Sequence, residues 1–178
     1  RHPRHADDRA DSMTTELETR WLPRLRAKLL GYDVFLSHRR SDGAVFAANL
    51  AESLKGIGVT PFRDVAEIPA GEPLPESLRR ALRRSRLLVV VGSPDAMVRR
   101  KEHDWVWDEI EVHREVHGRP PIVICIPGAG TAPWSTEDRA YRLPELTKAW
   151  QTNIPSASTV EGIGAAVGFR RANRIGVA

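Results

Sequence analysis

The feature that most constrains the fold is an uninterrupted apolar run of Leu and Val at residues 87–91. A membrane-spanning helix needs about 20 apolar residues, so this run is far too short to cross a bilayer. A short run without a polar face is typical of a strand buried on both sides, at the centre of a parallel sheet covered by helices. Residues 122–126 form a second run of this kind. Both runs favour an α/β domain.

Strand and helix patterns alternate along residues 31–173, which we assign to one domain. Strands are predicted, in chain order, at residues 32–37, 59–62, 87–91, 122–126 and, more weakly, 151–154. Strands alternating with helices form right-handed βαβ units. The expected fold is therefore an open, flavodoxin-like, five-stranded parallel sheet with helices on both faces.

Helix signals separate these strands. After the first strand, Ser41 or Asp42 is expected to cap a helix whose inward face ends with Ile57. A later helix is predicted over residues 103–117, and Gly118 is expected to end it. A final helix is expected from about residue 159.

The flanking residues are predicted to lie outside the domain. Residues 1–13 are polar and without periodicity, which is typical of a disordered leader, and residues 14–30 carry the pattern of a short N-terminal helix. Residues 174–178 are read as a tail, or as a linker to a sensor or oligomerisation domain. No signal segment or membrane span is expected, and the single cysteine, Cys125, favours a reducing compartment. A cytoplasmic location is the expectation.

The charge of +4 and the pI of about 9.7 suggest a nucleic-acid ligand only weakly. The 27 basic and 23 acidic residues are mixed along the chain, so that no basic arm stands out. Nucleic acid is therefore not the expected partner, and an arginine-rich helix over residues 79–86 keeps it as a third alternative.

In open α/β sheets, ligands bind beyond the carboxyl ends of the strands. The turn after the first strand reads Ser-His-Arg-Arg-Ser-Asp-Gly, which is neither a dinucleotide-binding glycine motif nor a phosphate-binding P-loop. The central strand runs into Gly92 and Ser93 rather than into the aspartate of a phospho-receiver domain. His113 and His117 have helical spacing but no nearby third ligand, so no metal site is expected.

Several motifs occur in the order found in one known family. They are Tyr-Asp-Val-Phe-Leu-Ser at residues 32–37, Arg-Asp at 63–64 before Ile-Pro-Ala-Gly-Glu at 68–72, the segment 81–93, and Trp-Val-Trp-Asp-Glu-Ile at 105–110. Over residues 32–150 the chain resembles the Toll/interleukin-1 receptor (TIR) domain family. The Trp-x-x-x-Glu element is similar to that of the NAD-cleaving branch, which includes the animal axon-degeneration NAD hydrolase and bacterial relatives.

The resemblance implies that Glu109 is the catalytic residue of an NAD+ glycohydrolase. It also implies that the loop at residues 64–75 must leave the pocket before substrate enters. The absence of an aromatic residue near Leu74 makes ring stacking by this loop doubtful. The residues for which the resemblance implies substrate contact are His38, Arg39, Arg40, Pro69, Leu74, Trp105 and Trp134. Trp134 is expected to approach the nucleotide from a neighbouring subunit.

One carboxylate is chemically sufficient for this reaction. Glycoside hydrolysis usually needs two carboxyl groups, because an alkoxide leaves poorly. Nicotinamide leaves NAD+ as a neutral molecule and needs no proton, so that only the developing oxocarbenium charge must be stabilised. The expected products are nicotinamide and ADP-ribose, or a cyclic isomer. NAD+ is then the substrate, and no cofactor is expected.

The resemblance further implies activation by self-association of TIR domains, in prokaryotic immune defence. The alternative is a non-catalytic TIR–TIR interaction module, in which Glu109 is a solvated helical charge, Trp105 packs in the core and the arginine pair serves solubility. A glutamate four residues after Trp105 separates the two hypotheses, because a scaffold does not need it.

Overall fold

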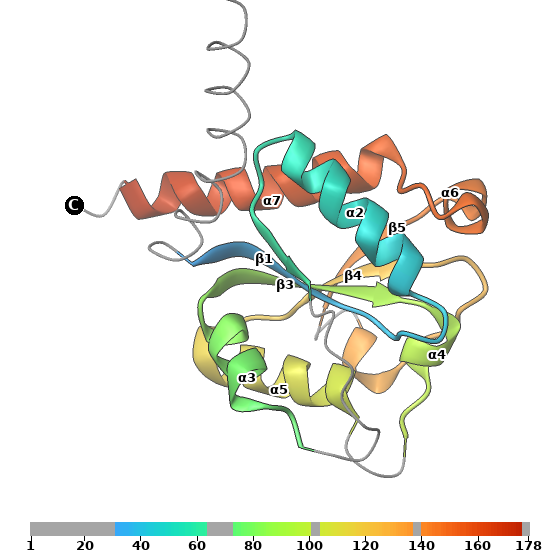
Figure 1. Cartoon of the computed structure of the whole chain (residues 1–178), viewed down its shortest axis with the longest axis horizontal. Coiled ribbons are helices and arrows are strands. Elements are labelled where there is room, and N and C mark those ends of the chain that lie inside the picture. The colour runs from blue at the N-terminus through green and yellow to red at the C-terminus, as the bar shows by residue number, and fades with distance from the viewer. Residues whose placement is uncertain (1–30, 64–72, 101–103, 137–139, 176–178) are drawn as a thin grey trace, which may run out of the picture. The chain divides into compact units, whose positions relative to one another are not determined.

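Strand β3 (Ser85–Gly92) lies at the centre of a five-stranded sheet (Figure 1). Its neighbours are β1 (Tyr32–Ser37) and β4 (Ile122–Cys125), while β2 (Pro61–Arg63) and β5 (Tyr141–Pro144) form the two edges. All four pairings are parallel, in the order β2-β1-β3-β4-β5. This is the flavodoxin-like order, so the predicted fold class is confirmed.

The structure is a computed structural model that describes residues 31–63, 73–100, 104–136 and 140–175. The predictions made for residues 1–13, for residues 14–30 and for the tail beyond residue 175 lie outside this range. Residues Tyr32–Ala178 form one compact unit.

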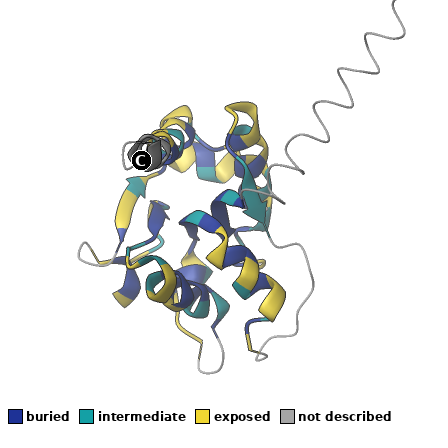
Figure 2. Cartoon of the chain, turned by 90° about the vertical axis from the view of Figure 1, so that its left-hand side faces the viewer, coloured by how far each residue is buried: buried dark blue, intermediate teal, exposed yellow. Residues whose placement is uncertain are grey.

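Helices cover both faces of the sheet (Figure 1). Helices α2 (Ala44–Gly56) and α7 (Ala157–Ile175) lie on one face, and α3 (Glu76–Arg83) and α5 (Trp105–His117) lie on the other. Alternate residues of β3 point to opposite faces: Val89 belongs to the core beside α2 and α7. Its neighbours Leu88 and Val90 belong to the core beside α3 and α5. Figure 2 shows buried residues on the inner sides of these helices.

Three short helical segments complete the fold. Helix α4 (Pro94–Met97) follows β3 directly, and Ser93 caps it by accepting a 3.4 Å hydrogen bond from the Ala96 amide. The 3₁₀ turn η1 (Pro133–Ser135) precedes β5, and α6 (Thr147–Thr152) follows it. No helix within the described ranges combines the length and the apolar character needed to cross a membrane.

The last strand was predicted at the wrong place. Residues 151–154 contain the end of α6, not a strand, and the fifth strand is Tyr141–Pro144. Most of the residues in this edge strand are exposed, so it lacks the apolar signature of β3. Its final residue, Pro144, is tolerated because an edge strand has one unpaired side.

Two expectations for α2 were also wrong. Ile57 is 51% exposed and lies at the C-cap, beyond the inward face formed by Phe46, Leu50 and Leu54. Helix α2 begins at Ala44 with Gly43 as its N-cap, so neither Ser41 nor Asp42 occupies that position. In contrast, Gly118 ends α5 as predicted, in the left-handed conformation at φ 60°.

Candidate active site

Two strand-end loops are joined by a partly buried hydrogen-bond network around Asp42, in the loop after β1. The Ser93 hydroxyl, at the end of β3, donates a 2.6 Å hydrogen bond to Asp42 Oδ1. The backbone amide of Asp95 donates a 2.9 Å bond to Asp42 Oδ2. The Ser41 hydroxyl, from the same loop as Asp42, donates a hydrogen bond to the Asp95 carboxylate. The loop after β1 is thereby fixed to the first turn of α4.

A second link joins the loop after β1 to the start of α5. The guanidinium of Arg39 forms an ion pair with Asp104, and the two side chains are only 10% and 4% exposed. Asp104 occupies the N-cap position of α5, and its Oδ2 also accepts a 3.0 Å hydrogen bond from the Arg100 amide. Because both side chains are shielded from water, this attraction is screened much less than that of a surface pair.

Glu109 lies on the buried side of α5. It is 6% exposed and lies among the inward-facing residues Val106, Ile110 and His113. Trp105, one helical turn earlier, is half-buried and packs against the same core. This burial contradicts the alternative in which Glu109 is a solvated helical charge. A carboxylate and an indole therefore share one side of a helix that begins at the Arg39–Asp104 pair.

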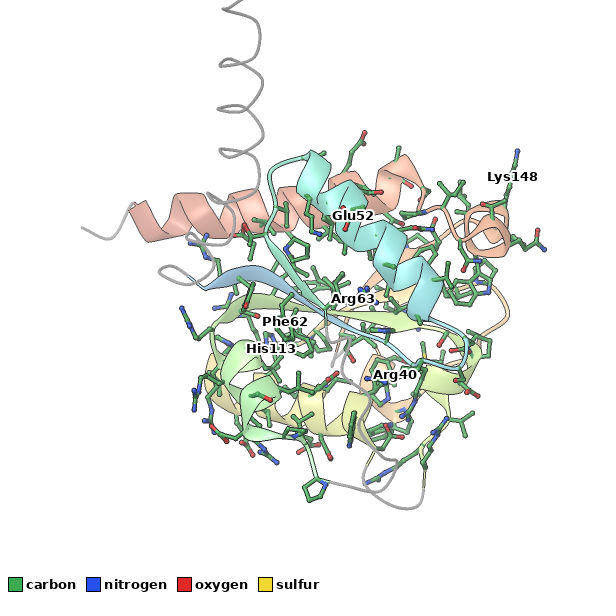
Figure 3. The ribbon with its side chains drawn as sticks, in the orientation of Figure 1. Arg40, Glu52, Phe62, Arg63, His113 and Lys148 are labelled. Atoms are coloured by element: carbon green, nitrogen blue, oxygen red, sulfur yellow. The ribbon has the colours of Figure 1, made fainter. Side chains whose placement is uncertain are left out.

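The three consecutive residues after β1 differ in environment. His38 is half-buried and Arg39 is buried against Asp104, whereas Arg40 is exposed at the carboxyl end of β1 (Figure 3). The guanidinium of Arg40 is therefore accessible to a phosphate group, for which arginine has suitable geometry. Substrate contact by any of the three stays a prediction.

Two other predicted contact residues are packed in the core. Leu74 is 3% exposed and lies in the same apolar cluster as Leu78. Trp134 is 1% exposed, with its ring edge-on to that of Trp107 at 6.4 Å between centroids. These placements do not support direct substrate contact in this conformation, and Trp134 offers almost no surface to a second subunit. Pro69 lies outside the described residues.

Gly92 allows α4 to lie close to the end of β3. A Cβ atom at this position would be 2.5 Å from the Met97 methyl carbon and 2.6 Å from the Ile124 carbonyl oxygen. The Met97 methyl group is the end of a flexible side chain and can move, whereas the Ile124 carbonyl belongs to the backbone of β4, so a larger residue would strain the pairing of β3 with β4.

Asp104 and Asp42 are site residues that were not predicted from the sequence. Aspartate before a helix usually signals a cap, and in neither position does the carboxylate act as one. Both side chains instead bind groups from distant parts of the chain. Only the strand-end rule, which brings these loops together, gave a signal for them.

Two observations on the described residues concern metal and nucleic-acid ligands. Among the described residues, no three His, Cys, Asp or Glu side chains are grouped so as to hold a metal ion. Several arginines of the basic segment contact the protein itself: Arg83 is 3.2 Å from Glu76, and Arg86 is 3.4 Å from Asp33. Arg79 donates a 3.1 Å hydrogen bond to the Leu74 carbonyl.

The fold and the site together define a doubly wound α/β domain whose candidate active site lies at the carboxyl edge of the sheet. A profile of the TIR domain family matches residues 34–152. The chain therefore belongs to the TIR domain family, as the sequence motifs indicated.

Three curated relatives are similar over part of the chain. The 2' cyclic ADP-D-ribose synthase AbTIR of Acinetobacter baumannii is 33% identical over 52% of this chain and 34% of its own length. The NAD(+) hydrolase TcpA of a Theionarchaea archaeon is 33% identical over 52% of this chain and 27% of its own length. The NAD(+) hydrolase TirS of Staphylococcus aureus is 29% identical over 75% of this chain and 46% of its own length. Each alignment thus covers less than half of the relative.

Proposed function

We propose that this chain is an NAD+ glycohydrolase that breaks the bond between nicotinamide and ribose. The observation that carries the proposal is the burial of Glu109 one helical turn after Trp105, on a helix whose start is paired with the loop after β1. The names of the three relatives, two NAD(+) hydrolases and a cyclic ADP-D-ribose synthase, support the same class of reaction.

In this proposal Glu109 acts as an ionised carboxylate beneath the ribose. The bond from C1′ to the nicotinamide nitrogen breaks, and both electrons stay with nicotinamide, which leaves uncharged. The sugar becomes an oxocarbenium cation, whose charge the nearby carboxylate stabilises in a site of low polarity. Water adds to C1′ and loses a proton to solvent, which gives ADP-ribose. A nucleophilic group of the same molecule gives a cyclic isomer instead.

The remaining substrate contacts come from the loop after β1 and the first turn of α5. The exposed guanidinium of Arg40 binds the pyrophosphate, and Arg39 and His38 line the same end of β1. Trp105 supplies an aromatic surface beside Glu109. Glu109, Leu74 and Trp134 meet substrate in this proposal only after a rearrangement that exposes them, because all three are buried here.

Self-association with other TIR domains is proposed to activate the reaction in the cytoplasm, as part of prokaryotic immune defence. A sensor or oligomerisation domain in the same protein would supply the trigger. The chain spans less than half of each curated relative, which leaves room for such a domain in the relatives.

The test measures nicotinamide release from NAD+ at several protein concentrations, with and without a crowding agent. Wild type is expected to release nicotinamide, with a rate per molecule that rises with concentration. Glu109→Gln keeps the size of the side chain and is expected to lower the rate by at least about 100-fold, as for other losses of transition-state charge stabilisation. Glu111→Gln is the matched control, because it removes the same charge from the exposed side of α5.

Equal release by wild type and Glu109→Gln would remove Glu109 from the mechanism. No release by wild type under any condition would favour the non-catalytic interaction module.

A further inference from the structure

We propose that Asp104 is a positioning residue that sets the place of Glu109 relative to the loop after β1. This inference rests on the proposed function, since it concerns the same site. Asp104 acts through Arg39 and through the first turn of α5, and it makes no contact with substrate. Asp104 links the loop after β1, which carries candidate substrate-binding residues, to α5, which carries the candidate catalytic residue.

One carboxylate oxygen of Asp104 makes two contacts. Asp104 Oδ2 pairs with the Arg39 guanidinium and accepts the Arg100 amide at 3.0 Å. The first contact comes from the loop after β1, and the second from the segment that follows α4. The carboxylate is therefore fixed from two sides, and its own position fixes the residue that begins α5.

The first turn of α5 leads from Asp104 to Glu109. The Asp104 carbonyl accepts a 2.8 Å hydrogen bond from the Asp108 amide, at the very start of α5. Glu109 is the next residue, and Trp105 directly follows Asp104. Since an α-helix moves as a stiff rod, a shift at its first turn moves both side chains together. The Arg39–Asp104 pair thus sets the distance between Glu109 and the arginines of the β1 loop.

The link between Arg39 and Asp104 is ionic rather than apolar, which bears on its role. Packed apolar residues in place of a buried ion pair often stabilise a protein equally well, so a buried pair is weak evidence of a role in stability. An ion pair with a hydrogen-bonded carboxylate does specify direction, however, which an apolar contact does not. Here it joins the ends of two separate elements at the candidate active site, where misplacement by about 1 Å can cost 100-fold in rate.

The kinetic test uses Asp104→Asn, which retains the shape and loses the charge, and Asp104→Glu, which retains the charge. Asp104→Asn is expected to lower kcat for NAD+ cleavage by about tenfold or more, with a smaller change in KM. Asp104→Glu is expected to stay closer to wild type than Asp104→Asn. Glu111→Gln, on the exposed side of the same helix, should leave kcat unchanged. Thermal denaturation in parallel confirms that each variant is folded at the assay temperature.

A merely structural role predicts a lower midpoint of unfolding for Asp104→Asn but an unchanged kcat per folded molecule. That result would overturn the proposal, and so would a kcat for Asp104→Glu no higher than that for Asp104→Asn. Amide hydrogen exchange gives a readout that needs no turnover. Asp104→Asn is expected to speed exchange in the first turn of α5 and in the β1 loop together, whereas Glu111→Gln is not.

The two readouts separate the failure of this inference from that of the proposed function. Suppose that wild type releases no nicotinamide, while Asp104→Asn speeds amide exchange in both the first turn of α5 and the β1 loop. That result would refute the glycohydrolase and retain Asp104 as the link between the two elements. If wild type is active, and Asp104→Asn changes neither the amide exchange nor kcat, the glycohydrolase is retained and the role of Asp104 is refuted.

Discussion

The hydroxyl of Ser93 donates a 2.6 Å hydrogen bond to the carboxylate of Asp42, and these residues follow the two neighbouring strands β3 and β1. Ser93 is completely buried, and the same carboxylate also accepts the amide of Asp95. One aspartate therefore satisfies two donors at the edge of the sheet where ligands bind in this class of fold. The positions of both loops depend on it.

We expect Asp42→Ala to lower the free energy of unfolding by about 2–3 kcal/mol, because the buried Ser93 hydroxyl and the Asp95 amide lose their acceptor. Ser93→Ala removes one donor to Asp42 together with the long capping bond to the Ala96 amide, and it should cost about 1 kcal/mol. Urea denaturation followed by tryptophan fluorescence measures both. The exposed carboxylate of Glu52 offers a control, and Glu52→Ala should change the free energy by less than about 0.5 kcal/mol. A cost for Asp42→Ala as small as this control would contradict the structural role.

The close approach at Gly92 gives a prediction about steric fit. A methyl group there would clash with the Ile124 carbonyl oxygen, a backbone atom that cannot rotate away. Gly92→Ala is therefore expected to lower the free energy of unfolding by about 2 kcal/mol or more. In Gly56→Ala the added methyl group meets nothing within 4 Å at the end of α2. That variant should be neutral or more stable by up to about 1 kcal/mol.

Thermal unfolding of the two alanine variants, compared with wild type, checks this pair. Comparing Gly92→Ala with Gly56→Ala controls for the general effect that replacing glycine by alanine has on the unfolded chain. Equal shifts in the midpoint would show that crowding at the end of β3 has no energetic consequence.

The central part of the fold was predictable because buried strands of a parallel sheet are apolar without interruption. This signature is present in β3 and β4 and extends, with one buried aspartate, to β1. It is absent from β5, where Tyr141 and Arg142 are exposed at the edge of the sheet. Residues 151–154 were predicted to form the last strand, but Ile154, the apolar residue of this segment, is 64% exposed in the structure.

Glu109 and Trp105 were predicted as site residues from the Trp-x-x-x-Glu motif of the TIR resemblance, and their spacing on a helix places them on one side. A role of either residue in catalysis stays a prediction. The partners of Arg39 and Asp42 were not predictable, because a charged residue carries no periodicity that indicates a distant partner. The burial of Trp134 was missed for a related reason. A tryptophan in an irregular segment has no pattern that separates packing from ligand contact, and its neighbour Trp107 comes from α5.

This burial makes a prediction about Trp134. Trp134→Ala leaves a large cavity beside Trp107 and should lower the free energy of unfolding by about 3–5 kcal/mol. Trp134→Phe retains an aromatic ring in the core and should cost less. The same variants tested for nicotinamide release separate packing from substrate contact. If Trp134→Phe remains as stable as expected yet loses activity, the indole contacts the substrate despite its burial in this structure.

The Arg39–Asp104 pair is expected to have a measurable coupling energy. Asp104→Asn and Arg39→Gln each leave one buried charge without its partner, and each is expected to lower the free energy of unfolding by about 3–5 kcal/mol. The double variant is neutral and retains two amides that can hydrogen-bond to each other, so it should cost less than the sum of the two single changes by about 2 kcal/mol or more. Urea denaturation of the four proteins gives this coupling energy directly. Additive costs would mean that the two side chains act independently, and the ion pair would then have no role in joining the β1 loop to α5.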